Sequence, residues 1–350
     1  MAGIDYFGGP PPKQGRFVEL YPGIFWIRMQ LPFRPGSVNV WALSDNDGWT
    51  IVDAGFDTPA ARDDWADILM SLGRPRVSRV LMTHAHLDHV GLAGWLADLL
   101  GAEFRIARSE FDYAKYLQSD WDLHQFAEFY RTAGCPEEMV GEFTTWRAWA
   151  WDALKSMPAR SLDVADGDVI TMGGRPWRTV ASGGHSREQL AFWCEQDGIL
   201  IGGDQVLPRI QPAIVVTAEE PQADPLADAF AGWERLKTLP ADTMVLPSHG
   251  EPFRGLHQRL DQLRHFYQDR LSRLISAATH SPVSPFDALG LIYGNKMPSS
   301  PRIAVGETQA HLNHLEAQGL VESLASSDGI RRYRRSVSTD LGASRAHRTF

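Results

Sequence analysis

The most constraining feature of this chain is a short polar run, Thr83-His84-Ala85-His86-Leu87-Asp88-His89, which places three histidines and one carboxylate within six positions. The apolar run from Val77 to Met82 comes directly before it and predicts a buried strand. The segment from Val90 to Leu100 predicts a helix. The polar residues would therefore lie on a strand-to-helix turn, where α/β proteins commonly place their functional sites.

The spacing within this run indicates a metal site with two halves. In extended backbone alternate residues face the same side, so His84 and His86 can point at one ion. Asp88 and His89 lie at the predicted helix start and face a second direction. Imidazole and carboxylate suit zinc and neighbouring divalent metals. The alternative is a histidine-rich surface turn, but chance would produce this four-residue pattern in roughly one chain in a thousand.

Composition narrows the classes of function. The chain has 350 residues, enough for one large domain and a smaller one. Its formal net charge of -9 gives no general attraction to nucleic acid or anionic membranes, although a local basic patch would still permit a nuclease. Cys135 and Cys194 are its two cysteines, so neither a disulfide framework nor a thiolate metal site is indicated. The N-terminus lacks the apolar core of a signal peptide and no run could span a bilayer, so we expect a cytoplasmic protein without a membrane partner.

Around the polar run, strand patterns alternate with helix patterns. Residues 1–16 are rich in Gly and Pro and predict an irregular arm. Helices are expected at 58–72 and 224–239, and this β-α-β rhythm implies helices packed on a sheet face. Strands are expected at 24–29, 38–43, 49–52, 103–107, 169–172, 177–181, 189–194, 199–202 and 243–246.

Residues 108–160 are helical in character and dense in aromatic side chains. One interpretation is a lid that walls an apolar substrate pocket. The other is that these rings pack against the body of the protein or against a second subunit, which would favour a homodimer. Both interpretations are open at this point. His124 lies in this segment and is expected to be structural.

Three further residues repeat one pattern, a ligand-type side chain in the turn after a strand. His185 lies at the tip of a glycine-rich turn, Asp204 follows the strand at 199–202, and His249 follows the strand at 243–246. Each is a weak signal alone, and the repetition strengthens all three. Asp53 ends the strand at 49–52 and is either a turn aspartate or a carboxylate that holds a ligand histidine, which is the interpretation we favour.

The C-terminal part has its own outline. A long helix is expected at 256–279, with surface or packing roles for His257 and His265, and a Pro/Ser joint follows at 281–285. Short helices at 286–293 and 307–318 precede a hairpin with arms at 320–324 and 330–333, which is the outline of a winged helix. Its four arginines (Arg331, Arg332, Arg334 and Arg335) permit a DNA-binding regulator, but we favour a packing or dimer module. Residues 336–350 are expected to form a mobile tail.

On these residues the sequence resembles the metallo-β-lactamase superfamily over roughly residues 17–255. The C-terminal part resembles the winged-helix-like module of the β-lactamase-like protein 2 group. The chain departs from the family pattern at Gly183, where a proline is common, and this change removes no ligand. The residues similar to the family's ligand series are His84, His86, Asp88, His89, His185, Asp204 and His249, with Asp53 as its strand-end aspartate.

The resemblance implies an α/β fold, the αββα sandwich, with the helical insert at about 108–160. It implies a catalytic domain at 1–280 and a winged-helix-like module at 281–335. Two divalent ions are implied, with zinc expected and manganese or iron as alternatives. By position, His84, His86 and His185 would bind the first ion, Asp88, His89 and His249 the second, and Asp204 would bridge them.

Two metals about 3.5–4 Å apart can hold a hydroxide between them and lower the pKa of that water toward neutrality. We therefore predict a hydrolase in which the bridging hydroxide attacks an ester-type carbonyl of a small molecule: a thioester, lactone or carboxylic ester. Asp88 and Asp53 are the predicted catalytic carboxylates, Asp88 by orienting the hydroxide and Asp53 by holding a histidine. The alternative is a phosphodiesterase or ribonuclease, against which the acidic balance argues only weakly.

Overall fold

The computed structural model describes residues 3–46, 48–119, 122–151, 154–294, 298–324 and 326–336. These residues form two compact units. The first unit draws on positions 1–121, 148–212 and 231–261, and the second on positions 122–147, 213–230 and 262–350. The predicted tail lies outside the described residues, apart from Ser336. No helix within the described ranges is long and apolar enough to cross a membrane.

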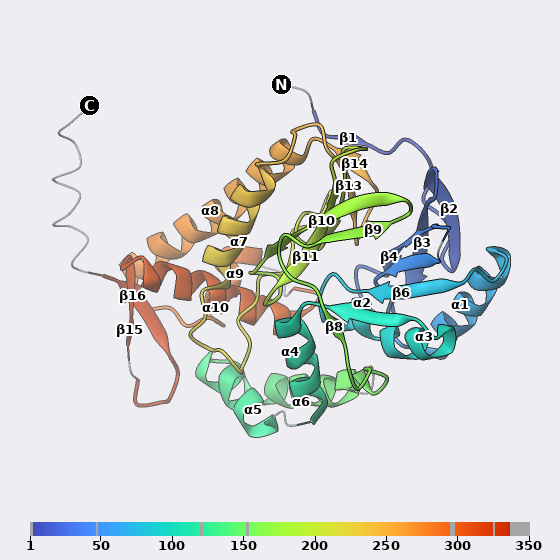
Figure 1. Cartoon of the computed structure of the whole chain (residues 1–350). Coiled ribbons are helices and arrows are strands. Elements are labelled where there is room, and N and C mark those ends of the chain that lie inside the picture. The colour runs from blue at the N-terminus through green and yellow to red at the C-terminus, as the bar shows by residue number, and fades with distance from the viewer. Residues whose placement is uncertain are drawn as a thin grey trace, which may run out of the picture. The chain divides into compact units, whose positions relative to one another are not determined.

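The first unit contains two sheets, each of seven strands among the described residues (Figure 1). One sheet is antiparallel from β2 to β5 and parallel from β5 to β8. Its order is β2 (Arg16–Tyr21), β3 (Ile24–Gln30), β4 (Ser37–Leu43), β5 (Trp49–Val52), β6 (Val77–Leu81), β7 (Glu103–Ile106) and β8 (Leu162–Asp163).

In the other sheet, β12 and β13 run parallel and the remaining pairs are antiparallel. Its order is β1 (Asp5–Tyr6), β14 (Phe253–Arg254), β13 (Met244–Pro247), β12 (Ile199–Gly203), β11 (Gln189–Cys194), β10 (Arg175–Ser182) and β9 (Val169–Met172). The parallel β12–β13 pair and the parallel β5–β6 pair each end in turns that carry candidate ligands.

The two sheets pack face to face through a buried apolar core. Trp26 and Trp41 of the first sheet are stacked with ring centroids 6.1 Å apart, and both are almost fully buried. Trp177 and Phe192 of the second sheet belong to the same cluster of buried side chains. Burial of such rings removes 150–250 Å² of mostly apolar surface each, so this layer is a main source of stability.

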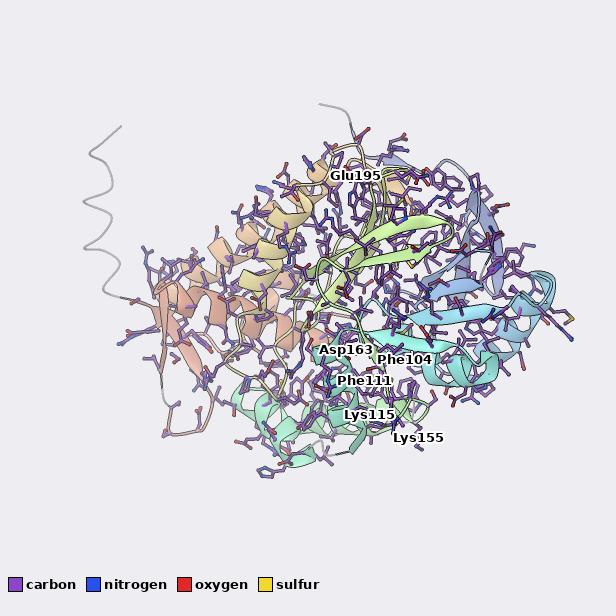
Figure 2. All side chains as sticks on the ribbon, viewed as in Figure 1. Phe104, Phe111, Lys115, Lys155, Asp163 and Glu195 are labelled. Carbon is purple, nitrogen blue, oxygen red and sulfur yellow. The ribbon has the colours of Figure 1, made fainter. Side chains whose placement is uncertain are left out.

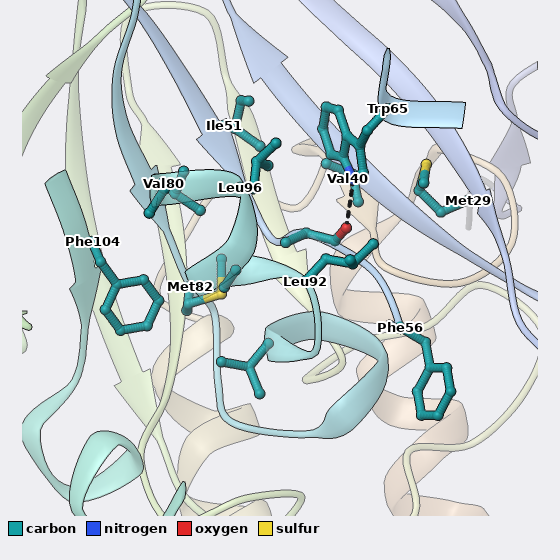
Figure 3. Close-up of a cluster of buried hydrophobic side chains, with 14 of the residues drawn as sticks. Met29, Val40, Ile51, Phe56, Trp65, Val80, Met82, Leu92, Leu96 and Phe104 are labelled. Carbon is teal, nitrogen blue, oxygen red and sulfur yellow. Dashed lines mark hydrogen bonds between the residues drawn. The ribbon is translucent and has the colours of Figure 1, made fainter. Parts of the chain in front are cut away.

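A second core lies on the outer face of the first sheet (Figure 3). Helices α1 (Pro59–Ser71), α2 (Leu87–Val90), α3 (Ala93–Leu100) and α4 (Arg108–Ser119) contribute to this region. In α1, Thr58 accepts a hydrogen bond from Ala61 N as the N-cap, and Pro59 takes the first helical position. Trp65 of the same helix donates its indole N–H to the carbonyl of Ala54 at 2.9 Å, just after β5.

The second unit has a separate core. It includes α5 (Leu123–Thr132), α9 (Leu289–Tyr293), α10 (Pro301–Ala317) and the hairpin of β15 (Val321–Leu324) and β16 (Arg332–Arg335). Helices α6 (Glu137–Trp151), α7 (Pro225–Leu236) and α8 (Leu256–His280) give residues to both units. Phe126, Phe129, Tyr130 and Phe143 of the predicted insert pack with Val305 in this core. For these rings the structure supports packing rather than a lid.

The predicted two-sheet α/β architecture with external helices is present, and most strands lie within a residue or two of their expected places. The irregular arm at 1–16 is wrong in part, because Asp5 and Tyr6 pair with Arg254 and Phe253. The single helix at 90–100 is also wrong, because the chain breaks at Gly91-Leu92 into α2 and α3. Helix α10 starts at Pro301 rather than at 307, with proline again at the first helical position. The domain boundary at 280 and the winged-helix assignment stay predictions.

Candidate metal centre

The histidine-rich run leaves the first sheet where β6 ends at Leu81. His84 and His86 lie in the loop that follows, and Asp88 and His89 lie in the single turn of α2. The predicted strand-to-helix turn is therefore present, with the helix starting at Leu87.

Three imidazoles converge at the first part of the site. Nδ1 of His86 lies 3.0 Å from Nε2 of His84 and 2.9 Å from Nε2 of His185. His185 comes from the second sheet, in the turn between β10 and β11. The three side chains offer ligand atoms within 4.8 Å of one another, which is the arrangement expected of nitrogen ligands around one ion.

A second group lies beside the first. Nε2 of His249 is 3.3 Å from Oδ2 of Asp88, and Nε2 of His89 is 3.8 Å from the same oxygen. His249 lies just beyond β13 of the second sheet. These three side chains also offer ligand atoms within 4.8 Å of one another.

Asp204 contacts side chains of both groups. Its Oδ2 lies 3.2 Å from Nε2 of His185, 3.5 Å from Nε2 of His249 and 3.7 Å from Nε2 of His89. Together with His84 and His89 it forms a further set of ligand atoms within 4.8 Å. Asp204 directly follows β12, so the parallel β12–β13 pair delivers both Asp204 and His249. The structure thus brings all seven predicted ligand residues together.

Asp53 fixes the orientation of one of these rings. It lies just after β5 in the left-handed region, with φ of 64°. Its Oδ2 is 2.8 Å from Nδ1 of His89, and its Oδ1 accepts from the backbone N–H of Thr83 at 2.8 Å. An Nδ1–H donated to this carboxylate leaves Nε2 of His89 as the ligand atom. The sequence favoured such a contact for Asp53, and the role of His89 as a metal ligand stays a prediction.

The ring of His249 is held in the same way by backbone. Its Nδ1 donates to the carbonyl of Ser37 at 2.9 Å, which again leaves Nε2 toward the centre. The amide of Asn39 donates to the carbonyls of Pro247 and Gly250 at 2.8 Å each, on both sides of His249. Strands β4 and β13 therefore position this turn together.

The first group is electrostatically suited to neutral imidazole. Burial and the neighbouring His185 lower the pKa of His86 to about 3. Burial, with the nearby rings of His89 and His86, also holds the pKa of His84 well below its usual value. Neutral imidazole is the form that binds a metal.

The second group is a cluster of facing charges. Burial alone would lower the pKa of His249, but Asp204 and Asp88 outweigh it and raise that pKa to about 10. The pKa of His89 likewise lies well above its usual value, because Asp53 and the other carboxylates outweigh burial. Burial would raise the pKa of Asp88, but the facing His89 and His249 lower it. Without a metal, protons on the histidines take the place of cations.

Two buried atoms show that these residues fit a cation. Nε2 of His89 and Oδ1 of Asp204 have no hydrogen-bond partner among the described residues. Leaving buried polar atoms unpaired is costly, and metal ligation is a common reason for it. The donor set contains imidazole and carboxylate without thiolate, which suits zinc and also manganese or iron. The residues therefore fit the two ions that the sequence predicted.

An aromatic stack is attached to loops of this region. Phe56, in the loop after β5, stacks on Trp149 at 5.4 Å and meets Phe33 edge-on at 5.2 Å. Phe33 belongs to the loop between β3 and β4, and Ser37, the first residue of β4, accepts from His249 through its carbonyl. Phe56 is buried, whereas Trp149 is 47% exposed. The loop after β5 thus carries apolar surface together with Asp53, which holds the ring of His89, although it carries no candidate ligand.

Two residues that hold the ligand loops in place, Thr83 and Glu110, were not assigned a role from the sequence. Thr83 donates its hydroxyl to Asp53 and contacts Nδ1 of His84 at 2.9 Å, and its position directly before His84 was an available signal. Glu110 is fully buried and accepts hydrogen bonds from the backbone of Ala85 and Glu188. An acidic residue in the first turn of a helix usually interacts with solvent and the helix dipole, so no local signal marked Glu110.

The remaining singled-out histidines lie outside the three ligand groups found among the described residues. His124 and His265 are exposed side chains of the second unit. His257 donates from Nε2 to the carbonyl of Leu239 at 2.7 Å. These positions are consistent with the surface or packing roles expected of His257 and His265, whereas the structural role expected of His124 stays a prediction.

This fold and site have counterparts among known proteins, and the chain belongs to the metallo-beta-lactamase superfamily, whose family model matches residues 33–249. A second model, the metallo-beta-lactamase-like C-terminal domain, matches residues 271–336. These matches confirm the predicted superfamily and fold class and show a metallo-beta-lactamase-like C-terminal domain, whose winged-helix character stays a prediction.

Among solved structures, a beta-lactamase domain protein from Burkholderia ambifaria superimposes with a TM-score of 0.89. The two chains are 34% identical, and the match covers 95% of this chain and 98% of that one. A probable metallo-hydrolase of Bacillus subtilis (strain 168) is 24% identical, covering 85% of this chain and 93% of the relative. An acyl-coenzyme A thioesterase of Gallus gallus is 24% identical, covering 59% of this chain and 68% of the relative.

Proposed function

We propose that the protein hydrolyses ester-type bonds of small molecules, namely thioesters, lactones or carboxylic esters. The observation that carries the proposal is the aromatic stack of Phe33, Phe56 and Trp149, in which Phe56 lies three positions after Asp53, the residue that holds the ring of His89. An apolar surface beside a hydrolytic centre suits an acyl or aryl group. Similarity to an acyl-coenzyme A thioesterase supports the same class.

In this proposal the seven side chains hold two divalent ions, most simply zinc. His84, His86 and His185 form one ligand group, Asp88, His89 and His249 the other, and Asp204 serves both. When bound, such ions supply a nucleophilic water at neutral pH and stabilise negative charge on the substrate oxygen. Asp53 keeps the proton of His89 on Nδ1, and Asp88 is positioned to orient the attacking water.

The charged side chains near the ligand turns favour an ester over a phosphodiester. Arg187, two positions after His185, lies over the ring of Tyr113 at 4.3 Å. Arg209 donates to Glu251 and lies over the ring of Tyr6. Both guanidinium groups are engaged by neighbours, whereas recognition of a phosphate backbone needs cations directed at the substrate.

A DNA-binding role for the C-terminal hairpin receives less support. Arg332 pairs with Asp328 at 2.8 Å, and Arg334 pairs with Glu322 at 2.8 Å. Each pair offsets a positive charge on the hairpin, so a packing or dimer module remains our preferred proposal for this part.

The test is a substrate panel on metal-loaded protein. Thioesters, lactones, carboxylic esters and phosphodiesters are assayed in parallel, and turnover of at least one ester class well above the phosphodiesters is expected. Turnover of phosphodiesters alone, falling steeply with added salt, would replace this proposal with the nuclease alternative. Phe56→Ala should raise KM for substrates with long acyl groups more than for acetyl esters.

A further inference from the structure

Glu110 connects the two loops that supply the His84–His86–His185 group. We propose that Glu110 is a positioning residue that sets the metal affinity of this group by holding the two loops at a fixed separation. The inference rests on the metal centre of the proposed function but not on the identity of the substrate.

The carboxyl group of Glu110 accepts one hydrogen bond from each of the two loops. Its Oε2 accepts the backbone N–H of Ala85 at 2.9 Å, and Ala85 lies between His84 and His86. Its Oε1 accepts the backbone N–H of Glu188 at 2.7 Å, three positions after His185. Both oxygens of Glu110 accept from backbone donors, and hydrogen bonds from backbone N–H groups to a carboxyl group of this kind fix its orientation.

The helix that carries Glu110 is itself fixed to the first sheet. Glu110 lies in the first turn of α4, directly after β7. The next residue, Phe111, contacts Phe104 of β7 with ring centroids 6.3 Å apart (Figure 2). The backbone N–H of Phe111 donates to Ala107 at 3.0 Å. Glu110 is fully buried, so its carboxylate cannot exchange these partners for water without moving the helix.

A second contact of α4 reinforces the bridge. The hydroxyl of Ser109 donates to Oε2 of Glu188, the residue whose backbone Glu110 also binds. In addition, Leu190 N donates to the carbonyl of Thr83 at 2.8 Å, which links the two segments beyond Glu110. One turn of α4 therefore restrains the His185 loop through two side chains, whereas it reaches the loop of His84 and His86 through Glu110.

Two roles for Glu110, stabilising the fold and positioning the ligands, lead to different expected effects of its loss on metal affinity. If Glu110 only stabilises the fold, its loss lowers the unfolding midpoint and leaves metal affinity unchanged in the folded protein. If it positions the ligands, affinity falls for one of the two metal equivalents even well below the unfolding midpoint. Partners that orient ligands from outside the coordination sphere are typically worth about 10–100-fold in affinity.

The experiment is a Co²⁺ titration of the metal-free full chain, followed by visible absorption and by competition with a chromophoric chelator. Glu110→Gln keeps the shape but turns an NH₂ group toward one of the two backbone N–H donors. We expect about 10–100-fold weaker binding of one Co²⁺ equivalent, an altered d–d absorption band, and an unchanged second equivalent. If Glu110→Gln does not fold, Ser109→Ala, which loosens the His185 loop only, should still weaken that equivalent by several-fold.

The matched control is Glu307→Gln, which changes a buried glutamate of the second unit and should leave both Co²⁺ affinities unaltered. Wild-type affinity for both equivalents in Glu110→Gln overturns the inference, as does a wild-type protein that binds no metal. A wild-type protein that binds two Co²⁺ ions but hydrolyses none of the esters refutes the proposed substrate class while leaving the role of Glu110 intact.

Discussion

Asp204 differs from the other six candidate ligands because a single oxygen, Oδ2, lies within 3.7 Å of imidazoles from both groups. His84 and His249, by comparison, belong to opposite groups. At the scale of single residues, the structure therefore distinguishes candidate ligands that belong to one group from the candidate ligand that contacts both groups. This difference can be tested by metal content alone.

Asp204→Ala should weaken both metal equivalents by more than about 100-fold, since even indirect partners of a ligand are worth 10–100-fold. Metal content after gel filtration, measured by atomic emission, provides the check. His124→Ala is the control, because His124 lies in the second unit and outside the ligand groups. Loss of metal from His124→Ala would show that the ligand assignment is wrong.

The facing charges of the second group predict how metal binding depends on pH. The pKa of His249 is raised to about 10 and that of His89 lies well above its usual value, so both rings are protonated near neutrality in the metal-free protein. Binding at Nε2 must expel these protons, so metal affinity should fall as pH falls below 10.

Calorimetric titration in buffers of different ionisation enthalpy measures the protons released, and about two per pair of ions, one from each ring, are expected near pH 7. Binding that releases no protons would contradict the charge assignment of this group. Zinc titration of His257→Ala is a suitable control, since His257 donates to Leu239 and belongs to neither group.

At the scale of elements, the sequence predicted those helix and strand boundaries that depend on contacts between neighbouring residues. Thr58 and Pro59 marked the start of α1 because the cap and the first helical position are set by adjacent residues. Strand β1 has two residues and pairs with β14 across the chain, which no local pattern reveals. The role of Glu110 was equally unpredictable, because its hydrogen-bond partners, Ala85 and Glu188, are far away in the sequence.

Two helix glycines have opposite surroundings. A Cβ added at Gly94 in α3 would overlap the carbonyl oxygen of Ser156, so Gly94→Ala should destabilise the protein by about 3 kcal/mol or more. Gly141 in α6 has open space around it, and Gly141→Ala should stabilise the helix by about 0.5–1 kcal/mol. Urea unfolding of both variants tests the pair, and equal effects would show that packing at Gly94 is looser than described.

At the scale of the whole molecule, the candidate ligands come from turns of both sheets. His84 and Asp88 follow β6 of the first sheet, whereas His185, Asp204 and His249 follow strands of the second. The sequence revealed this convergence because each turn carries a ligand-type residue after a strand. The residue pattern alone could not reveal which turn contacts which, since that depends on sheet packing, and the grouping of the turns came from the family resemblance.

Removal of the metals should therefore affect stability as well as catalysis. Chelator treatment is expected to abolish ester hydrolysis and to lower the thermal midpoint, because metal at about 1,000 times its dissociation constant contributes about 4 kcal/mol. Zinc, manganese or iron should restore both properties. Turnover that survives exhaustive chelation, with no metal detected in the protein, would exclude the metal-dependent mechanism.

Hydrogen bonds join the hairpin turns of the two sheets, and these turns provide a position for a label. Asp45, between β4 and β5, accepts from the backbone of Gly174, between β9 and β10, while Arg175 reaches Pro22 in the turn before β3. These turns hold none of the seven candidate ligands. A fluorophore or a short peptide tag introduced at Gly174 would consequently report on the joined sheets during catalysis while leaving the chemistry untouched.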